Sequence, residues 1–115
     1  MYCLFLILND VYKLDALMED LYQAGAGATI IDSLGMGKVL IEHDLDIPIF
    51  SGLRRLVENN KPYNKTIISV FKDKEKLDAV IEKFKVELDY FKHPGVGFMF
   101  VLPVLECHGS KAIKD

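Results

Sequence analysis

Residues 1–34, MYCLFLILNDVYKLDALMEDLYQAGAGATIIDSL, hold the pattern that decides the fold. The first eight are apolar or aromatic without a break, which is typical of a strand in the middle of a sheet. Leucine and methionine then recur at helical spacing over positions 14–21, and Asn9 and Asp10 are expected to cap that helix. The run Ala24–Gly27 ends it, because glycine accepts the left-handed conformation of a helix C-terminus. Residues 29–34 are expected to form a second strand.

The second half of the chain repeats this order. Residues 66–71 and 98–105 predict two more strands, the last with Pro103 at an edge or a bulge. Between them we expect a helix with Asp73 as its N-cap and an apolar stripe of Leu77, Val80, Ile81, Phe84 and Leu88. The two halves are joined by residues 36–64, where helical spacing predicts one short helix; a stretch of this length in a compact domain usually serves a function.

The element order predicts one α+β domain over residues 1–115, with the ferredoxin-like βαββαβ arrangement. In it, a four-stranded antiparallel sheet carries both helices on one face, and a long, partly helical loop joins the second and third strands. The first and fourth strands are nevertheless apolar at nearly every position. Since a monomer would expose a large apolar patch, we expect the chains to self-associate and cover each other's open sheet faces.

The composition narrows the range of functions. The 115 residues are 50% hydrophobic with a formal net charge of −3, a balance that argues against a general nucleic-acid binder. No apolar run approaches the ~20 residues of a membrane span, and the start lacks the basic region and cleavage site of a signal peptide. Cys3 and Cys107 are expected to be buried thiols and not a bridge, so we expect a cytoplasmic protein.

Two glycine turns and an arginine pair are the candidate binding residues. Gly35-Met36-Gly37-Lys38 either offers backbone N–H groups and an ammonium to an anion or is a plain strand exit. Gly95-Val96-Gly97 either lets a ligand approach the backbone or only turns the chain from helix to strand. Arg54 and Arg55 in the loop either pair with a phosphate or carboxylate of a ligand or partner, or lie on a solvated helix face.

The sequence contains no pattern typical of a metal site or of a catalytic site. The three histidines and Cys107 lack the paired Cys-x-x-Cys or His-x-x-x-His spacing of structural zinc sites. No motif joins a nucleophile to a base and an orienting group. We therefore expect neither an enzyme nor a metal site.

The runs Lys13–Ala16, Gly25–Thr29, Gly35–Lys38 and Gly95–Val104 resemble the PII nitrogen-regulatory signalling proteins. The resemblance covers roughly residues 1–38 and 65–105. It implies a homotrimer of ferredoxin-like subunits, with nucleotide sites in the clefts between them. It also implies that the long loop, the T-loop, contacts a partner protein.

The resemblance further implies which residues bind the effector, an adenine nucleotide or another anion. They border the adenine pocket, stand at the base of the T-loop or wrap the phosphates: Gly27, Thr29, Gly35, Gly37, Lys38, Gly95, Val96 and Gly97.

The sequence departs from the family in its second glycine turn. The turn normally reads Gly-Asp-Gly-Lys, but here Val96 replaces the aspartate and Phe98 the lysine, and the family's arginine pair past the last strand is missing. Since burying unpaired phosphate charge is costly, we expect a mono- or diphosphate nucleotide or a small carboxylate in place of ATP with magnesium. A metal-binding or metal-tolerance trimer of similar fold is the alternative.

Overall fold

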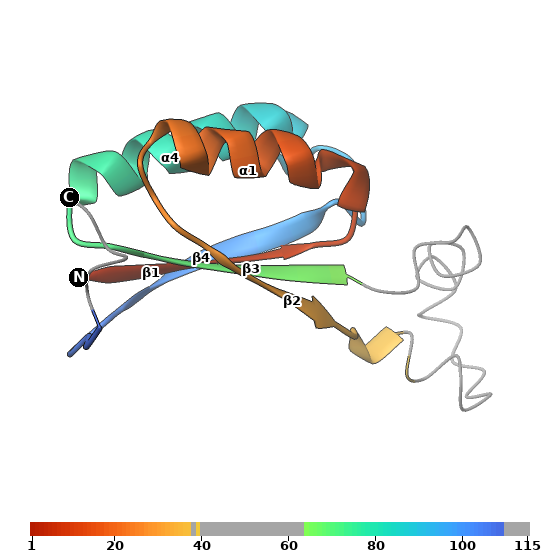
Figure 1. Cartoon of the computed structure of the whole chain (residues 1–115). Helices are drawn as coiled ribbons and strands as arrows, with labels where there is room; N and C mark the ends of the chain where they lie inside the picture. Colours follow the sequence, from red (N-terminus) through yellow and green to blue (C-terminus); the bar gives the residue numbers. More distant parts are fainter. Residues whose placement is uncertain (38, 40–63, 110–115) are drawn as a thin grey trace.

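A computed structural model gives the fold and describes residues 1–37, 39 and 64–109. It is an α+β structure in which both long helices cover one face of a single sheet (Figure 1). The elements, in chain order, are β1 (Tyr2–Leu8), η1 (Val11–Lys13), α1 (Leu14–Gln23), β2 (Thr29–Ser33), β3 (Asn64–Phe71), α4 (Lys74–Glu87), η3 (Asp89–Phe91) and β4 (Gly97–Pro103).

The sheet has four strands in the order β2-β3-β1-β4, and all neighbours are antiparallel. This order is compatible with the predicted ferredoxin-like arrangement. The position of Pro103 is confirmed, because it ends an edge strand, where its missing N–H costs no ladder bond. The short helix predicted within the long loop lies outside the described residues.

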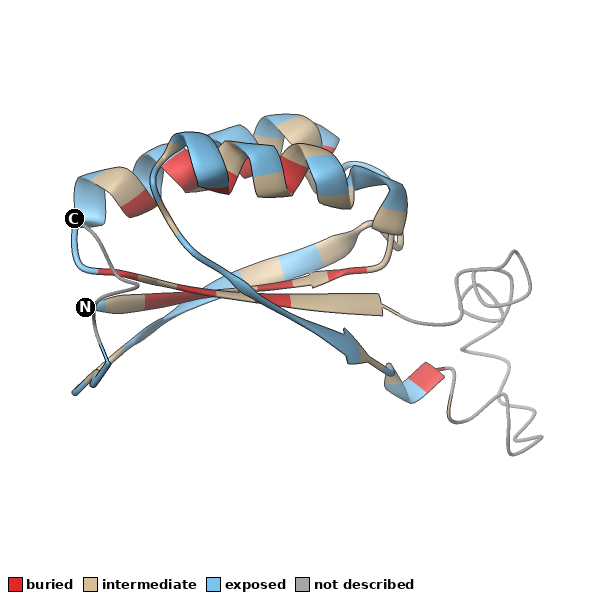
Figure 2. Ribbon diagram, viewed as in Figure 1, coloured by how far each residue is buried: buried red, intermediate tan, exposed pale blue. Residues whose placement is uncertain are grey.

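The core lies between the sheet and the helices. Alternate residues of β1 point into it, and Leu4, Leu6 and Leu8 are at most 1% exposed. Figure 2 shows the same buried band on the inner sides of both helices, where Leu17, Leu21, Leu77, Val80, Phe84 and Leu88 contribute. The apolar stripes predicted for the two helices are therefore confirmed.

Two of the predicted helix ends are confirmed, the N-cap of α4 and the C-terminal end of α1. Asp73 does cap α4, since its carboxylate accepts a hydrogen bond from the backbone N–H of Glu75 at 2.9 Å. Gly25 ends α1 with φ of +71°, while the Gly25 and Ala26 N–H groups bond back to the carbonyls of Tyr22 and Leu21.

The predicted cap at Asn9 and Asp10 is wrong. The turn η1 precedes α1, and neither helix receives a side-chain cap. Since α1 begins at Leu14, directly after η1, with Lys13 in its N-cap position, Asn9 and Asp10 lie too early in the chain to cap it. Their backbone N–H groups instead both donate to the carbonyl of Val96, at 2.9 and 3.3 Å. These bonds tie the end of β1 to the turn before β4.

The second face of the sheet carries apolar side chains that no helix covers. We call it the open face; it consists of Cys3, Phe5, Ile7, Ile68, Val70, Phe98, Phe100 and Leu102, which alternate with the core positions of their strands. Phe100 stacks on Phe5 with 5.1 Å between ring centroids and lies 6.1 Å from Phe98. Phe98 is 58% exposed, Leu102 46% and Phe100 39%, so the β4 part of the open face is accessible in a single chain. Cys3 is buried, and the other four residues of the face are half-buried.

Cys3 is buried, Cys107 is half-buried, and both are free thiols. The predicted burial therefore holds for Cys3 and only in part for Cys107. Burial raises the pKa of the Cys3 thiol, which makes it a poor nucleophile at neutral pH. No helix in the described ranges combines the length and apolar character needed to cross a bilayer.

Candidate functional site

The first glycine turn follows β2. The strand ends at Ser33, and a helical turn begins at Met36, where the carbonyl of Gly35 accepts a bond from the N–H of Val39 at 3.3 Å. Gly37 is buried in this turn, while Lys38 lies outside the described residues. The glycines therefore mark the exit from the strand, as predicted.

A polar cluster missed by the sequence analysis closes the base of the long loop. The Ser33 hydroxyl contacts the side chain and carbonyl of Asn64 and lies 2.7 Å from the Thr66 hydroxyl. A Cβ built on Gly35 would lie 3.6 Å from the Asn64 amide nitrogen. The cluster joins the two ends of the loop beside the first glycine turn. Only the pairing of β2 with β3 brings these residues together, so no local pattern marks them.

The second glycine turn is shaped by the backbone of β1. Gly95 has φ of +80° and Gly97 has φ of +143°, both in the region that favours glycine. A Cβ on Gly97 would lie 2.2 Å from the carbonyl oxygen of Ile7. Val96 donates its N–H to His93, accepts from Asn9 and Asp10, and packs its side chain against the core. The turn therefore has a structural reason for its glycines whether or not it binds a ligand.

Gly27 and Thr29 lie at the far end of β2 from Gly35. The carbonyl of Gly27 accepts a bond from the Ser69 hydroxyl at 2.6 Å, and Thr29 pairs with Ile68 in the middle of β3. Both residues are exposed. At ~3.4 Å per residue, Thr29 and Ser33 are about 14 Å apart along the strand. The predicted adenine border and the base of the loop thus occupy opposite ends of one edge strand.

The two glycine turns lie at the same end of the sheet but on its opposite edges. Ser33 pairs with Asn64 at the start of β3, and Leu8 pairs with both Lys65 and Gly97. Because the order is β2-β3-β1-β4, two strands separate the turns. Three strand spacings put them about 14 Å apart. Within one chain they cannot both contact the same small group, and Arg54 and Arg55 lie outside the described residues.

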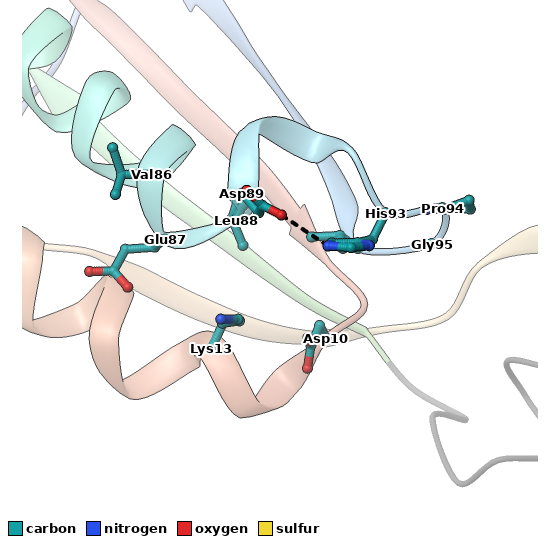
Figure 3. Close-up of a pocket in the computed structure, with 10 residues that line it drawn as sticks. Asp10, Lys13, Val86, Glu87, Leu88, Asp89, His93, Pro94 and Gly95 are labelled. Atoms are coloured by element: carbon teal, nitrogen blue, oxygen red, sulfur yellow. Dashed lines mark hydrogen bonds and ion pairs between the residues drawn. The ribbon is translucent and has the colours of Figure 1, made fainter.

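A hollow of about 450 Å³ lies at the end of α4, and of the predicted site only Gly95 and Val96 line it. We call it the α4-end hollow (Figure 3); its lining is Asp10, Lys13, Val86, Glu87, Leu88, Asp89, His93, Pro94, Gly95 and Val96. Its charged residues come from segments about eighty positions apart in the sequence. No sequence motif joins them, and only the fold reveals the group.

Metal-ligating side chains are scattered. Within residues 1–37, 39 and 64–109, no three His, Cys, Asp or Glu side chains gather closely enough to hold a metal ion. His93 instead lies 2.9 Å from the Asp89 carboxylate, an exposed pair that spans one turn.

No protein-family model matches the chain, and a search of curated proteins finds no match either. The resemblance to the PII family therefore rests on the residues quoted above.

Proposed function

We propose that the chain is a PII-like signalling protein of ferredoxin-like fold. Its copies associate into a homotrimer, bind a small anionic effector in the clefts between subunits, and report binding to a partner protein through the loop over residues 36–64. It acts in the cytoplasm and catalyses no reaction.

The placement of the two glycine turns carries the proposal. Both lie at the same end of the sheet, yet on edges about 14 Å apart. When the β2 edge of one copy meets the β4 side of another, the turns approach one ligand from two chains. The open face supplies a driving force for this association, since soluble monomers rarely expose an apolar patch of this kind.

The chemistry of the turns sets the class of effector. Backbone N–H groups hold an anion without a charged side chain. Neither Val96 nor Phe98 adds a positive charge at the second turn, and Lys38 adds one at the first. A ligand of low charge suits this site best: an adenine mono- or diphosphate, or a small carboxylate.

The base of the loop offers a route from binding to signalling. Ser33 and Asn64 hold the two ends of the loop together beside Gly35. An effector at Gly35 therefore touches the point from which both arms of the loop leave the sheet. If it binds one loop conformation more tightly than another, it shifts their populations. Arg54 and Arg55 are the residues we propose to contact the partner or the effector.

The alternative, a metal-binding trimer, gains no support from the described residues, where no ligand cluster exists.

Titration calorimetry of Gly35→Val tests the proposal, with AMP, ADP, ATP with magnesium, and small dicarboxylates as ligands. The fold accommodates a side chain at Gly35, because its φ is not in the left-handed region and its nearest neighbour would be at an ordinary 3.6 Å. The branched side chain would block the approach of a ligand to the backbone. Ala79→Val on the exposed side of α4 adds a branched side chain far from both turns and serves as the control.

We expect the wild type and Ala79→Val to bind the same ligand, and Gly35→Val to lose binding at least tenfold. Equal affinity in all three proteins, or no binding of any of these ligands, would overturn the proposal. Tight binding of ATP with magnesium would show that the missing lysine and arginines matter less than the charge argument requires.

A further inference from the structure

The exposed apolar side chains of the sheet are confined to its two edge strands (Figure 2). The apolar residues of β1 and β3 are buried or half-buried, whereas six on β2 and β4 are exposed: Ile30, Ile31, Phe98, Phe100, Val101 and Leu102. Ile30 and Val101 pair with core residues of β3 and β1, so they point to the helix side of the sheet, and the other four point to the opposite side. Contact along the edges would cover both sets, whereas contact between open faces would leave Ile30 and Val101 uncovered.

The outer backbone of β4 has no partner among the described strands. The Val96 carbonyl and the Val104 N–H bond to the chain on either side of β1. Because backbone groups alternate along an antiparallel ladder, Met99 and Val101 direct theirs away from β1. Natural edge strands usually carry charges or proline that prevent pairing, but β4 has no charge and its proline stands at the end. The edge of β4 is therefore open to a further strand.

The directions of the edge strands fit a repeat of the chain by rotation. β2 ends, and β4 begins, at the end of the sheet that holds both glycine turns, so the two strands run in opposite directions. A rotation about an axis along the strands keeps these directions, and β2 of one copy then meets β4 of the next in the antiparallel sense. Three four-stranded sheets joined in this way close into a ring that has no free edge.

The exposed side chains select the register. Helix-side residues must lie opposite helix-side residues, because a slip of one residue turns every side chain to the other face. With Ile30 opposite Val101, all five residues of β2 pair with β4, and Ile31 lies opposite Phe100. The exposed apolar residues of the two edges then cover one another on both faces of the sheet.

We propose that β2 of one copy pairs with β4 of the next in this register, and that the pairing builds the effector cleft. Ser33 then lies opposite Phe98, so Gly35 of one copy stands beside the turn Gly95–Gly97 of its neighbour. The separation of about 14 Å within one chain falls to one strand spacing, about 5 Å. This proposal rests on the homotrimer of the proposed function and adds the strand pairing that joins its two glycine turns.

Disulfide trapping tests the pairing in solution. Ile30→Cys combined with Val101→Cys, in a Cys107→Ser background, places the two Cα atoms about 5.5 Å apart across the junction, within disulfide range. Within one chain, the same positions are three strand spacings apart, about 14 Å, so a bond must join two chains. We expect mild oxidation to give covalent trimers on non-reducing denaturing electrophoresis.

Ile31→Cys combined with Val101→Cys, in the same background, is the matched control. Ile31 is 44% exposed against 42% for Ile30, but it points to the opposite face. We expect single chains on the same gel. Equal cross-linking of both pairs, or covalent chains longer than three, would overturn the proposal. No cross-link of the first pair in a trimeric protein would overturn the pairing alone, whereas a monomeric protein would overturn the homotrimer as well.

Val101→Pro tests the backbone bond itself. Because the Val101 N–H points away from β1, proline breaks no ladder bond within the chain, but it removes a donor to β2 of the next copy. Val101→Thr keeps the N–H and the branched shape, and it is the control. In a dilution series followed by light scattering, Val101→Pro should dissociate at a protein concentration at least tenfold higher than Val101→Thr. Equal dissociation would overturn the pairing. Neither test needs a ligand, so the calorimetry of the effector fails or succeeds separately.

Discussion

Asp20 on α1 carries a charge that the fold disfavours. One of its carboxylate oxygens is buried and has no hydrogen-bond partner in the described part of the chain. Burial first, and then the nearby charge of Glu87, raises the pKa of Asp20 above its ordinary value of 3.8. The folded protein therefore holds this proton more tightly than the unfolded chain does. A raised carboxyl pKa means that ionisation of Asp20 destabilises the fold as pH rises.

Asp20→Asn should therefore raise the free energy of unfolding at neutral pH. The amide keeps the size of the side chain and removes its charge. The gain should be full above the raised pKa and should vanish below pH 3.8, where Asp20 is protonated in both states. Urea unfolding across this range measures it. Asp15→Asn, an exposed residue of the same helix, is the control and should show no such gain. A loss of stability in Asp20→Asn at neutral pH would mean that the ionised carboxylate is stabilising.

At the scale of elements, α4 depends on its cap. The Asp73 carboxylate accepts the Glu75 N–H, one of four donors that the first turn cannot satisfy itself. Asp73→Ala should lower the free energy of unfolding by about 1 kcal/mol. Asp73→Ser should recover most of that loss, because a hydroxyl also accepts this bond. Denaturant unfolding measures both variants, and an unchanged midpoint in Asp73→Ala would rule the cap out as a source of stability.

Local sequence patterns predicted the strands and the long helices, and they missed features of the turns that join these elements. The apolar runs and helical stripes located all four strands and both long helices, since each pattern reflects burial on one side of its own element. The expected cap at Asn9 and Asp10 failed because η1 separates these residues from α1, whose N-cap position is Lys13. The left-handed turn at Asp89–Phe91 carries no glycine and is held by core contacts, so its sequence gives no sign of it.

In the candidate site, turn glycines were predictable from the sequence, and contacts between distant segments were not. The glycines of the second turn are visible in the sequence because glycine is needed where φ is positive or a backbone passes closely, whereas Gly35 at the strand exit has neither constraint. Their separation onto opposite edges follows only from the strand order. The cluster of Ser33, Asn64 and Thr66 and the α4-end hollow depend on side chains that meet through strand pairing and helix packing. The type of a single residue does not indicate which distant side chain it will contact.

At the scale of the whole molecule, the open face presents apolar side chains that no helix of the same chain covers. We expect the wild type to be a homotrimer at micromolar concentration. Phe100, stacked on Phe5 and 39% exposed, lies among the apolar residues of this face. Phe100→Lys should convert the trimer to a monomer, because association would bury an unpaired ammonium. Tyr22→Lys places the same charge on α1, where Tyr22 is 81% exposed, and should leave the trimer intact. Light scattering gives the mass of each protein. A monomeric wild type, or a Phe100→Lys trimer as stable as the wild type, would mean that the open face is not where the chains meet.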